Sequence, residues 1–253
     1  VQYGIQYTLT LENWEQTTKQ TSPVSKQFFE WSGTTKIEIA KDTITDQSGN
    51  TSNAQTFTLG HVDFIKPKIE RVSSTKDATS KTETIVFNVT DKNYDKDNPI
   101  TVDEMTIWID GKQVDDQVTK EITSAVAIRT TIDGQTRVVG HQYTLEIGSI
   151  VETDQEFINS NRTYRELSGP LQIKINPDAA SDLRGNMLNE NTTTITDTTD
   201  LIRPEVKYQY ATSNINKSDK TFTMVFEMVD KYYKESASTV LSINDLTIKI
   251  DNE

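Results

Sequence analysis

The sequence repeats itself with a period of about 137 residues, and this period limits the fold more than any other feature. Four segments recur at spacings of 136 to 139 residues. The matching pairs are 6–9 with 142–145, 46–50 with 182–186, 63–67 with 200–204, and 87–94 with 226–233. The small drift in spacing indicates loops of different length rather than a different unit. A long internal period is typical of proteins built from tandem units.

The repeat divides the 253 residues into one complete unit and two incomplete ones. Residues 64–201 match a complete unit, whereas 1–63 match only the C-terminal half of a unit and 202–253 only the N-terminal half of the next. A half unit lacks the sheet against which its apolar face would pack. We therefore expect either a longer parent chain or half units that complete one another between molecules in a filament. The longer parent is favoured, because the two halves together contain fewer residues than one unit.

Short stretches of alternating apolar and polar residues predict β-strands with one buried face. Threonine and β-branched residues dominate these stretches, and helical apolar spacing is scarce. The dipeptides Asp110-Gly111 and Asp133-Gly134 predict tight turns. The polar stretch 151–168 fits either a loop or a short helix. The predicted strands of the complete unit are 68–72, 82–90, 105–109, 121–131, 137–147, 171–175 and 191–197.

About seven short strands separated by turn signals predict an all-β sandwich. In a sandwich the inward-facing residues of both sheets form one core, and most of those in residues 64–201 recur elsewhere in the chain at the repeat spacing. The predicted core residues are Phe87, Val89, Ile107, Tyr143, Leu145, Ile173 and Ile175.

The order of these features resembles the bacterial immunoglobulin-like tandem repeats of large surface and secreted proteins. The matching features are the strand 142–145, the turn Asp182-Leu183-Arg184-Gly185-Asn186, the threonine-rich stretch 192–196, and Pro204 at the start of the next unit. The resemblance implies an all-β fold of tandem immunoglobulin-like β-sandwich units, one complete and two partial. The unit exceeds the roughly 100 residues of an immunoglobulin fold, so insertions are implied.

The resemblance also implies a function and a location. We expect a structural or spacer array of an extracellular or cell-surface bacterial protein, such as a stalk, an adhesin scaffold or a filament. Its partners would be neighbouring units of the same long chain, with other copies in a filament or a host or cell-surface ligand as further classes. Two alternatives stay open: a glycan- or protein-binding adhesin module, and an accessory array of a larger secreted enzyme.

The composition excludes several classes of partner. The net charge is −12 and the pI is about 4.7, whereas binding to nucleic acid or to an anionic membrane needs basic patches. Cysteine is absent, which excludes a disulfide scaffold. No run of 18 apolar residues occurs, so we expect no membrane insertion in this segment. A secretion signal or a wall anchor would lie outside these residues.

Acidic residues are predicted to meet where one unit joins the next. In a sandwich of this strand order, the loop after the second strand, the turn before the last strand and the incoming linker share one pole. Calcium prefers six to eight oxygen ligands from carboxylates, amides and carbonyls. The candidate Ca²⁺ ligands are Asp63, Asp91, Asp95, Asp182 and Asn186. The competing interpretation is turn chemistry alone, because Asp-x-x-Gly-Asn is also the pattern of a tight turn, and this interpretation is favoured.

No arrangement in the sequence predicts catalysis. Neither His61 nor His141 has an equivalent in the other repeat copy, and no phosphate-binding loop, nucleophile elbow or zinc spacing occurs. We therefore expect no enzymatic activity and no cofactor other than Ca²⁺. The three tryptophans are expected to pack rather than to stack on a ligand, because large aromatic residues in strands mostly pack; they are Trp14, Trp31 and Trp108.

Overall fold

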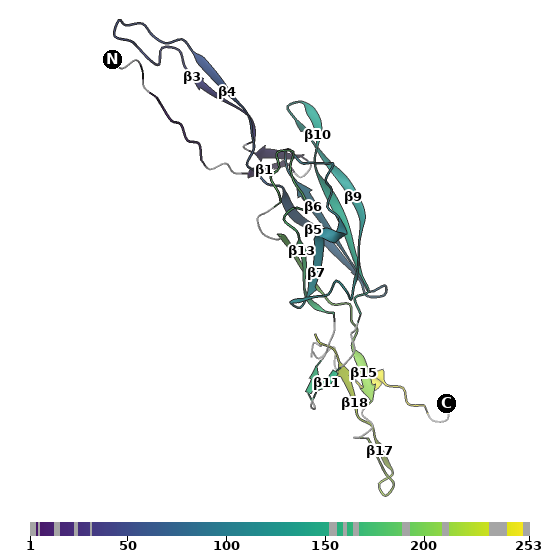
Figure 1. Cartoon of the computed structure of the whole chain (residues 1–253). Coiled ribbons are helices and arrows are strands. Elements are labelled where there is room, and N and C mark those ends of the chain that lie inside the picture. Colours follow the sequence, from purple (N-terminus) through teal and green to yellow (C-terminus); the bar gives the residue numbers. More distant parts are fainter. Residues whose placement is uncertain are drawn as a thin grey trace.

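The computed structural model describes residues 4, 6–12, 16–22, 25–30, 32–151, 156–158, 161–163, 167–188, 193–208, 213–232 and 242–249 (Figure 1). These residues form an all-β protein with several antiparallel sheets and no α-helix. Figure 1 shows an elongated molecule, with hairpins beyond both ends of a two-layered middle part. Across the described ranges, no helix has the length and apolar character that a membrane span needs.

The middle part of the chain, residues 64–201, contains two four-stranded sheets. The first sheet has the order β5-β6-β10-β9 and the second the order β14-β13-β7-β8. Their strands are β5 (Lys68–Asp77), β6 (Thr82–Thr90), β7 (Met105–Ile109), β8 (Lys112–Gln113), β9 (Thr119–Ile132), β10 (Gln135–Gly148), β13 (Gly169–Ile175) and β14 (Thr193–Thr199). A short 3₁₀ helix, η1 (Val102–Glu104), precedes β7, and the hairpin of β11 (Glu156–Ile158) and β12 (Asn161–Thr163) lies between β10 and β13 in the sequence.

The two sheets face each other across one apolar core, which makes the middle part sandwich-like. Alternating side chains of β6 and β10 meet alternating side chains of β7 and β13 in this core. Burial of these side chains is the main favourable term in folding. All seven residues predicted for the core are buried, at 0–1% exposure: Phe87, Val89, Ile107, Tyr143, Leu145, Ile173 and Ile175.

Both predicted turn dipeptides are confirmed as tight turns. Asp110 and Gly111 connect β7 to β8 with φ of 51° and 74°, and Asp133 and Gly134 connect β9 to β10 with φ of 51° and 76°. Two successive residues with positive φ match the twist of a hairpin, and Asp-Gly is a preferred pair for them. Gly140 has a different reason to be glycine, because a Cβ there would lie 2.0 Å from the carbonyl oxygen of Val89.

The structure adds strands that the sequence did not predict. β8 contains two residues, and the stretch 151–168, expected to be a loop or a short helix, contains the β11–β12 hairpin in its described residues. Trp108 occupies the face of β7 opposite Ile107 and Ile109, as expected, and the Nζ of Lys174 lies 3.3 Å from the centre of its ring. Trp14 and Trp31 lie outside the described residues.

Charged side chains connect the first and last strands of the middle part. Arg71 on β5 pairs with the carboxylate of Asp197 on β14. The Nζ of Lys76 lies 3.5 Å from Glu83 Oε1 and 3.7 Å from Asp197 Oδ1. Glu83 is fully buried, and this burial raises the pKa of its carboxyl group. The network therefore joins the free edges of the two sheets.

Two-stranded antiparallel sheets flank the middle part on both sides. The N-terminal part contains β1 (Gln16–Ser22), β2 (Ser25–Glu30), β3 (Gly33–Ile39) and β4 (Gln55–Val62). The C-terminal part contains β15 (Glu205–Tyr208), β16 (Asn214–Asn216), β17 (Thr221–Thr223), β18 (Phe226–Val229) and the 3₁₀ helix η3 (Ile243–Asp245). We name residues 63–67 the first joint and residues 200–204 the second joint, because they connect these parts to the middle part.

Repeat-equivalent apolar residues differ strongly in burial between the parts. Tyr143 and Leu145 are fully buried, but Tyr7 and Leu9, which occupy the same positions in the repeat, are 81% and 63% exposed. The residues are alike in type, so the difference comes from the second sheet that only the middle part provides among the described residues.

This difference predicts unequal effects of one substitution at two equivalent positions. Leu145→Ala should lower the free energy of unfolding of the middle part by about 2–5 kcal/mol, because it leaves a cavity in the core. Leu9→Ala should change it by less than about 0.5 kcal/mol, as exposed sites do. Urea denaturation followed by tryptophan fluorescence measures both effects, and equal losses for the two variants would contradict the assignment of the core.

Candidate metal centre

Three segments that are distant in sequence meet at the first joint. They are the joint itself, the loop 91–98 after β6, and the turn 181–187 between β13 and β14. The backbone NH of Asp95 donates to the carbonyl of Ser181 at 3.2 Å, and that of Leu183 donates to the carbonyl of Asn93 at 2.9 Å. These bonds hold the loop and the turn together, and Tyr94 and Asp182 form a β-bridge between them.

Each segment contributes one buried aspartate. Asp63, Asp91 and Asp182 are 9%, 0% and 2% exposed, and each offers a carboxylate oxygen that lies within 4.8 Å of the other two. Two oxygens bound to one Ca²⁺ at about 2.4 Å can be at most about 4.8 Å apart. The three oxygens therefore fit the first coordination shell of a calcium ion.

Backbone and amide groups fix the orientation of these carboxylates. Asp63 Oδ1 accepts the NH of Ile65 at 3.0 Å, and its Oδ2 accepts the side-chain amide of Asn93 at 2.6 Å. Asp91 Oδ1 accepts the NH of Asn93 at 2.6 Å. Three like charges that are buried together repel one another, and a divalent cation would offset this repulsion.

Two of the five candidate ligands have other roles. The side-chain amide of Asn186 donates to Asp182 Oδ2 at 2.6 Å and to the carbonyl of Asp63 at 3.3 Å, so its nitrogen faces the cluster and secures the turn. Asp95 Oδ1 accepts the NH of Asp97 at 3.1 Å, and Asp95 does not belong to the cluster. Of the five candidates, the structure thus brings three carboxylates together: Asp63, Asp91 and Asp182.

Asn93 was not among the predicted site residues, although it connects the loop after β6 to the first joint and to the N-terminal part. Its side-chain amide contacts both Asp63 and Ser32, and Ser32 belongs to the N-terminal part. Its position two residues after Asp91 was a usable signal, because an aspartate side chain often accepts the NH two residues later.

The Asp-x-x-Gly-Asn turn forms with the same hydrogen bonds at 46–50, where the three buried aspartates are not present. Asp46 is the repeat equivalent of Asp182 and is exposed, yet its carboxylate accepts the NH groups of Ser48 and Asn50 and the amide of Asn50, each at 2.8 Å. The bond from the Asn50 side chain is the main reason why the pKa of Asp46 is lowered. Gly49 and Gly185 both have φ of 86°. Turn chemistry therefore explains the motif in both copies, and only the second copy adds two more buried carboxylates.

A hydrogen-bonded cluster of aromatic side chains connects the loop 91–98 to β10. The hydroxyl of Tyr143 lies 3.2 Å from that of Tyr94 and accepts the NH of Ile100 at 3.0 Å. His141 Nδ1 lies 3.2 Å from the Tyr94 hydroxyl. Burial raises the pKa of both tyrosines and lowers the pKa of His141 below its ordinary value of 6.5.

No protein-family model matches this sequence, and no curated protein and no solved structure matches it either. Function is therefore inferred from the geometry of this chain.

If the cluster binds Ca²⁺, a chelator should lower the melting temperature of the chain. A ligand that binds only the folded state at a hundredfold excess over Kd stabilises it by about 2.7 kcal/mol, which corresponds to roughly 5–10 °C for a domain of this size. Asp182→Ala should abolish the difference between calcium and chelator. Asp46→Ala is the matched control, because it removes the same turn bonds outside the cluster and should keep the difference. Identical melting curves for the unaltered chain with and without chelator would leave Asp182 as a turn residue.

The aromatic cluster predicts a loss of stability in mild acid. His141 has a lowered pKa in the folded state, so its contribution is fully present above the unfolded value of about 6.5 and is lost as the pH falls through the folded value. Urea denaturation at several pH values between about 7.5 and 4.5 measures this loss. His141→Gln should flatten the dependence relative to the unaltered chain, whereas His61→Gln, which retains His141, should not. An unchanged slope in His141→Gln would contradict this role.

Proposed function

We propose that the chain is part of a tandem array of immunoglobulin-like units, which serves as a spacer or scaffold in an extracellular or cell-surface bacterial protein. The observation that carries this proposal is a lysine contact that occurs at both joints. Lys92 Nζ donates to the carbonyl of Ser32, and Lys231 Nζ donates to the carbonyl of Ser168 at 2.7 Å.

Both halves of this contact recur at the repeat spacing. Lys92 and Lys231 are 139 residues apart, and Ser32 and Ser168 are 136 apart. Each serine precedes a glycine with positive φ, at 141° for Gly33 and 131° for Gly169. A contact that joins neighbouring parts and recurs with the repeat is expected of a joint that every unit uses.

The local structure around each lysine is also repeated. Asp91 Oδ1 accepts the NH of Asn93 at 2.6 Å, and Asp230 Oδ1 accepts the NH of Tyr232 at 2.7 Å. This turn places the intervening lysine where it can reach back to the preceding part. At each joint the aspartate of the Asp-Lys pair forms the turn, and the lysine donates to a carbonyl of the preceding part.

The strand order supports the immunoglobulin-like assignment. In immunoglobulin domains, strands A, B, E and D form one sheet and strands G, F and C form the other. The order β5-β6-β10-β9 matches the first sheet, and β14-β13-β7 matches the second, with β8 as one additional edge strand. The long β9–β10 hairpin and the β11–β12 hairpin account for part of the extra length of the unit.

Strand register supports the tandem arrangement. β15 pairs with β18 from Glu205↔Val229 to Tyr208↔Phe226, and the same offsets place Lys68 opposite Thr90 and Arg71 opposite Phe87 in the β5–β6 pair. Register is set by the hydrophobic pattern of each strand. Equal register therefore favours one fold for each copy, with β15 and β18 as the first strands of the next unit.

A spacer needs joints that keep neighbouring units at a distance, and both joints have this character. They are short, and each contains one proline, Pro67 or Pro204, which keeps the preceding residue extended. The proposed partners are neighbouring units, with other copies in a filament or a surface ligand as further classes. The strongly negative charge would keep such a rod soluble by repulsion between its surfaces.

Small-angle X-ray scattering tests the proposed array. A compact chain of 253 residues would have a radius of gyration of about 18 Å, and we expect a clearly larger value with the distance distribution of a rod. Combined Lys92→Ala and Lys231→Ala substitutions should broaden that distribution, because the joints lose their contacts. Lys96→Ala is the control, since Lys96 lies in the same loop but pairs with the exposed Asp97. A compact unaltered chain, or a double variant that scatters like the control, would contradict the proposal.

A further inference from the structure

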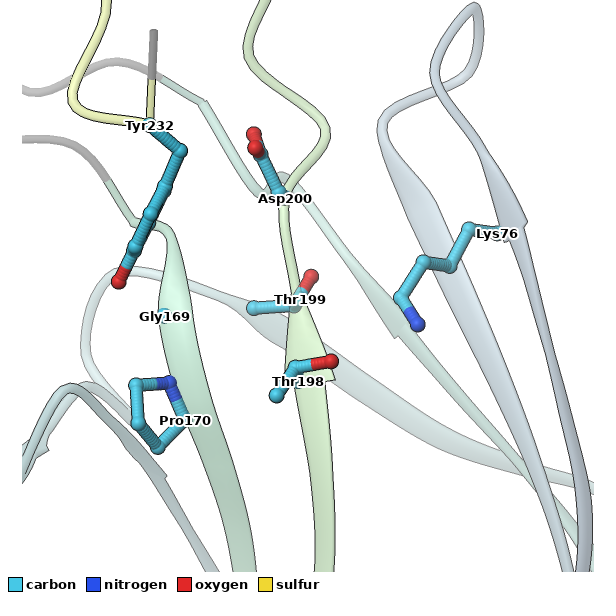
Figure 2. A pocket seen from close by; sticks show the side chains of 7 residues that line it. All are labelled: Lys76, Gly169, Pro170, Thr198, Thr199, Asp200 and Tyr232. Carbon is cyan, nitrogen blue, oxygen red and sulfur yellow. The ribbon is translucent and has the colours of Figure 1, made fainter. Parts of the chain in front are cut away.

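A cavity of about 560 Å³ lies at the second joint, where the middle part meets the C-terminal part (Figure 2). Pockets of about 300–1,000 Å³ are the usual size for small-molecule sites. In Figure 2, Pro170 and Tyr232 lie on one side of the strand end 198–200, and Lys76 lies on its other side. The cavity is separate from the aspartate cluster, because the two joints lie at opposite ends of the middle part (Figure 1).

The aromatic wall of the cavity is held by specific contacts. The hydroxyl of Tyr232 lies over Gly169, where a Cβ would be only 2.7 Å from it. The adjacent Lys231 is anchored to Asp110 at 2.9 Å and to the carbonyl of Ser168 at 2.7 Å. The Tyr232 side is therefore fixed before a ligand arrives, while the residue remains 46% exposed.

This aromatic residue distinguishes the second joint from the first. The repeat equivalent of Tyr232 is Asn93, which uses its amide to contact Asp63 and Ser32. A residue needed only for the joint would be expected to keep one chemistry at both joints. The tyrosine instead provides an apolar ring face that the first joint lacks.

The strand end and Lys76 provide hydrogen-bonding groups. Thr198 provides a hydroxyl, Asp200 an exposed carboxylate and Lys76 an ammonium group. Thr199 is 1% exposed, and its hydroxyl interacts with the buried carboxylate of Glu83, so it is not counted among the groups for a ligand.

We propose that this cavity binds a neutral pyranose ring of a saccharide. The apolar face of such a ring can pack on Tyr232 and Pro170, as apolar surfaces do on aromatic rings. Its hydroxyls can both donate and accept, which matches the mixture of hydroxyl, carboxylate and ammonium groups on the strand end and Lys76.

The charges of the site do not select an ion. The two charged residues that line the cavity, Asp200 and Lys76, have opposite signs, so the lining adds no net charge that would favour an anion or a cation. The array would thus carry a ligand contact at one joint, in addition to its role as a spacer.

Nuclear magnetic resonance of the ¹⁵N-labelled chain tests this site. The probes are the methyl glycosides of glucose, galactose, mannose and N-acetylglucosamine, each titrated to about 50 mM, because one ring with few contacts binds at roughly millimolar Kd. We expect at least one probe to shift the amide signals of Gly169, Thr199 and Tyr232. Sialic acid, which is anionic, should bind more weakly than that probe.

Variants distinguish the cavity from other surfaces. Tyr232→Ala should weaken binding at least tenfold, and Thr198→Val, which nearly conserves the side-chain volume within β14, should weaken it severalfold. Phe222→Ala removes an exposed aromatic outside the cavity and should leave binding unchanged. If Tyr232→Ala disorders the C-terminal part, Thr198→Val alone decides, since its strand belongs to the middle part. The proposal is overturned if no probe shifts these amides, if sialic acid binds most tightly, or if Thr198→Val binds as the unaltered chain does.

Discussion

The stacked pair of Phe87 and Tyr143 connects the core of the middle part to its first joint. The rings lie 5.3 Å apart between β6 and β10, and both residues are fully buried. The hydroxyl of Tyr143 accepts the NH of Ile100 and contacts Tyr94, which is bridged to Asp182. One side chain thus provides apolar contact to both sheets and a polar anchor for the loop that carries Asp91. This anchor and the backbone bonds between the loop and the turn 181–187 together hold Asp91 beside Asp182.

Much of the fold could be predicted because its signals are local. The alternation of apolar residues identified the strands and all seven core residues, and two Asp-Gly pairs identified two hairpins. β8 and the β11–β12 hairpin were missed, because strands of two or three residues are too short to show a period. The burial of Glu83 was also missed, since a carboxylate is not expected at a buried position and its partner Lys76 reaches it only through the pairing of β5 with β6. Of the site, topology correctly brought Asp63, Asp91 and Asp182 together, while Asp95 turned away because its carboxylate binds the NH of Asp97.

The two joints combine a shared frame with different contents. The lysine contact and the aspartate turn that positions it are present at both. Asn93 at the first joint serves a polar, acidic centre, whereas Tyr232 at the second provides the wall of a cavity. A frame that tolerates either residue allows each joint to differ in chemistry without a change in the sheets. The two joints therefore share the contacts of the lysine and the aspartate with the backbone, but not the side chain that follows the lysine.

The charged connection between β5 and β14 has a mechanical consequence. The chain enters the middle part through β5 and leaves it through β14, so a pull on the two joints draws these strands in opposite directions along their lengths. The ion pair of Arg71 with Asp197 and the position of Lys76 between Glu83 and Asp197 lie across this line of force. Together with the nine residue pairs between β5 and β6, they would be loaded in shear and would share the force, instead of breaking one after another. Tension would thus meet its greatest resistance where the two open edges of the sheets are closest.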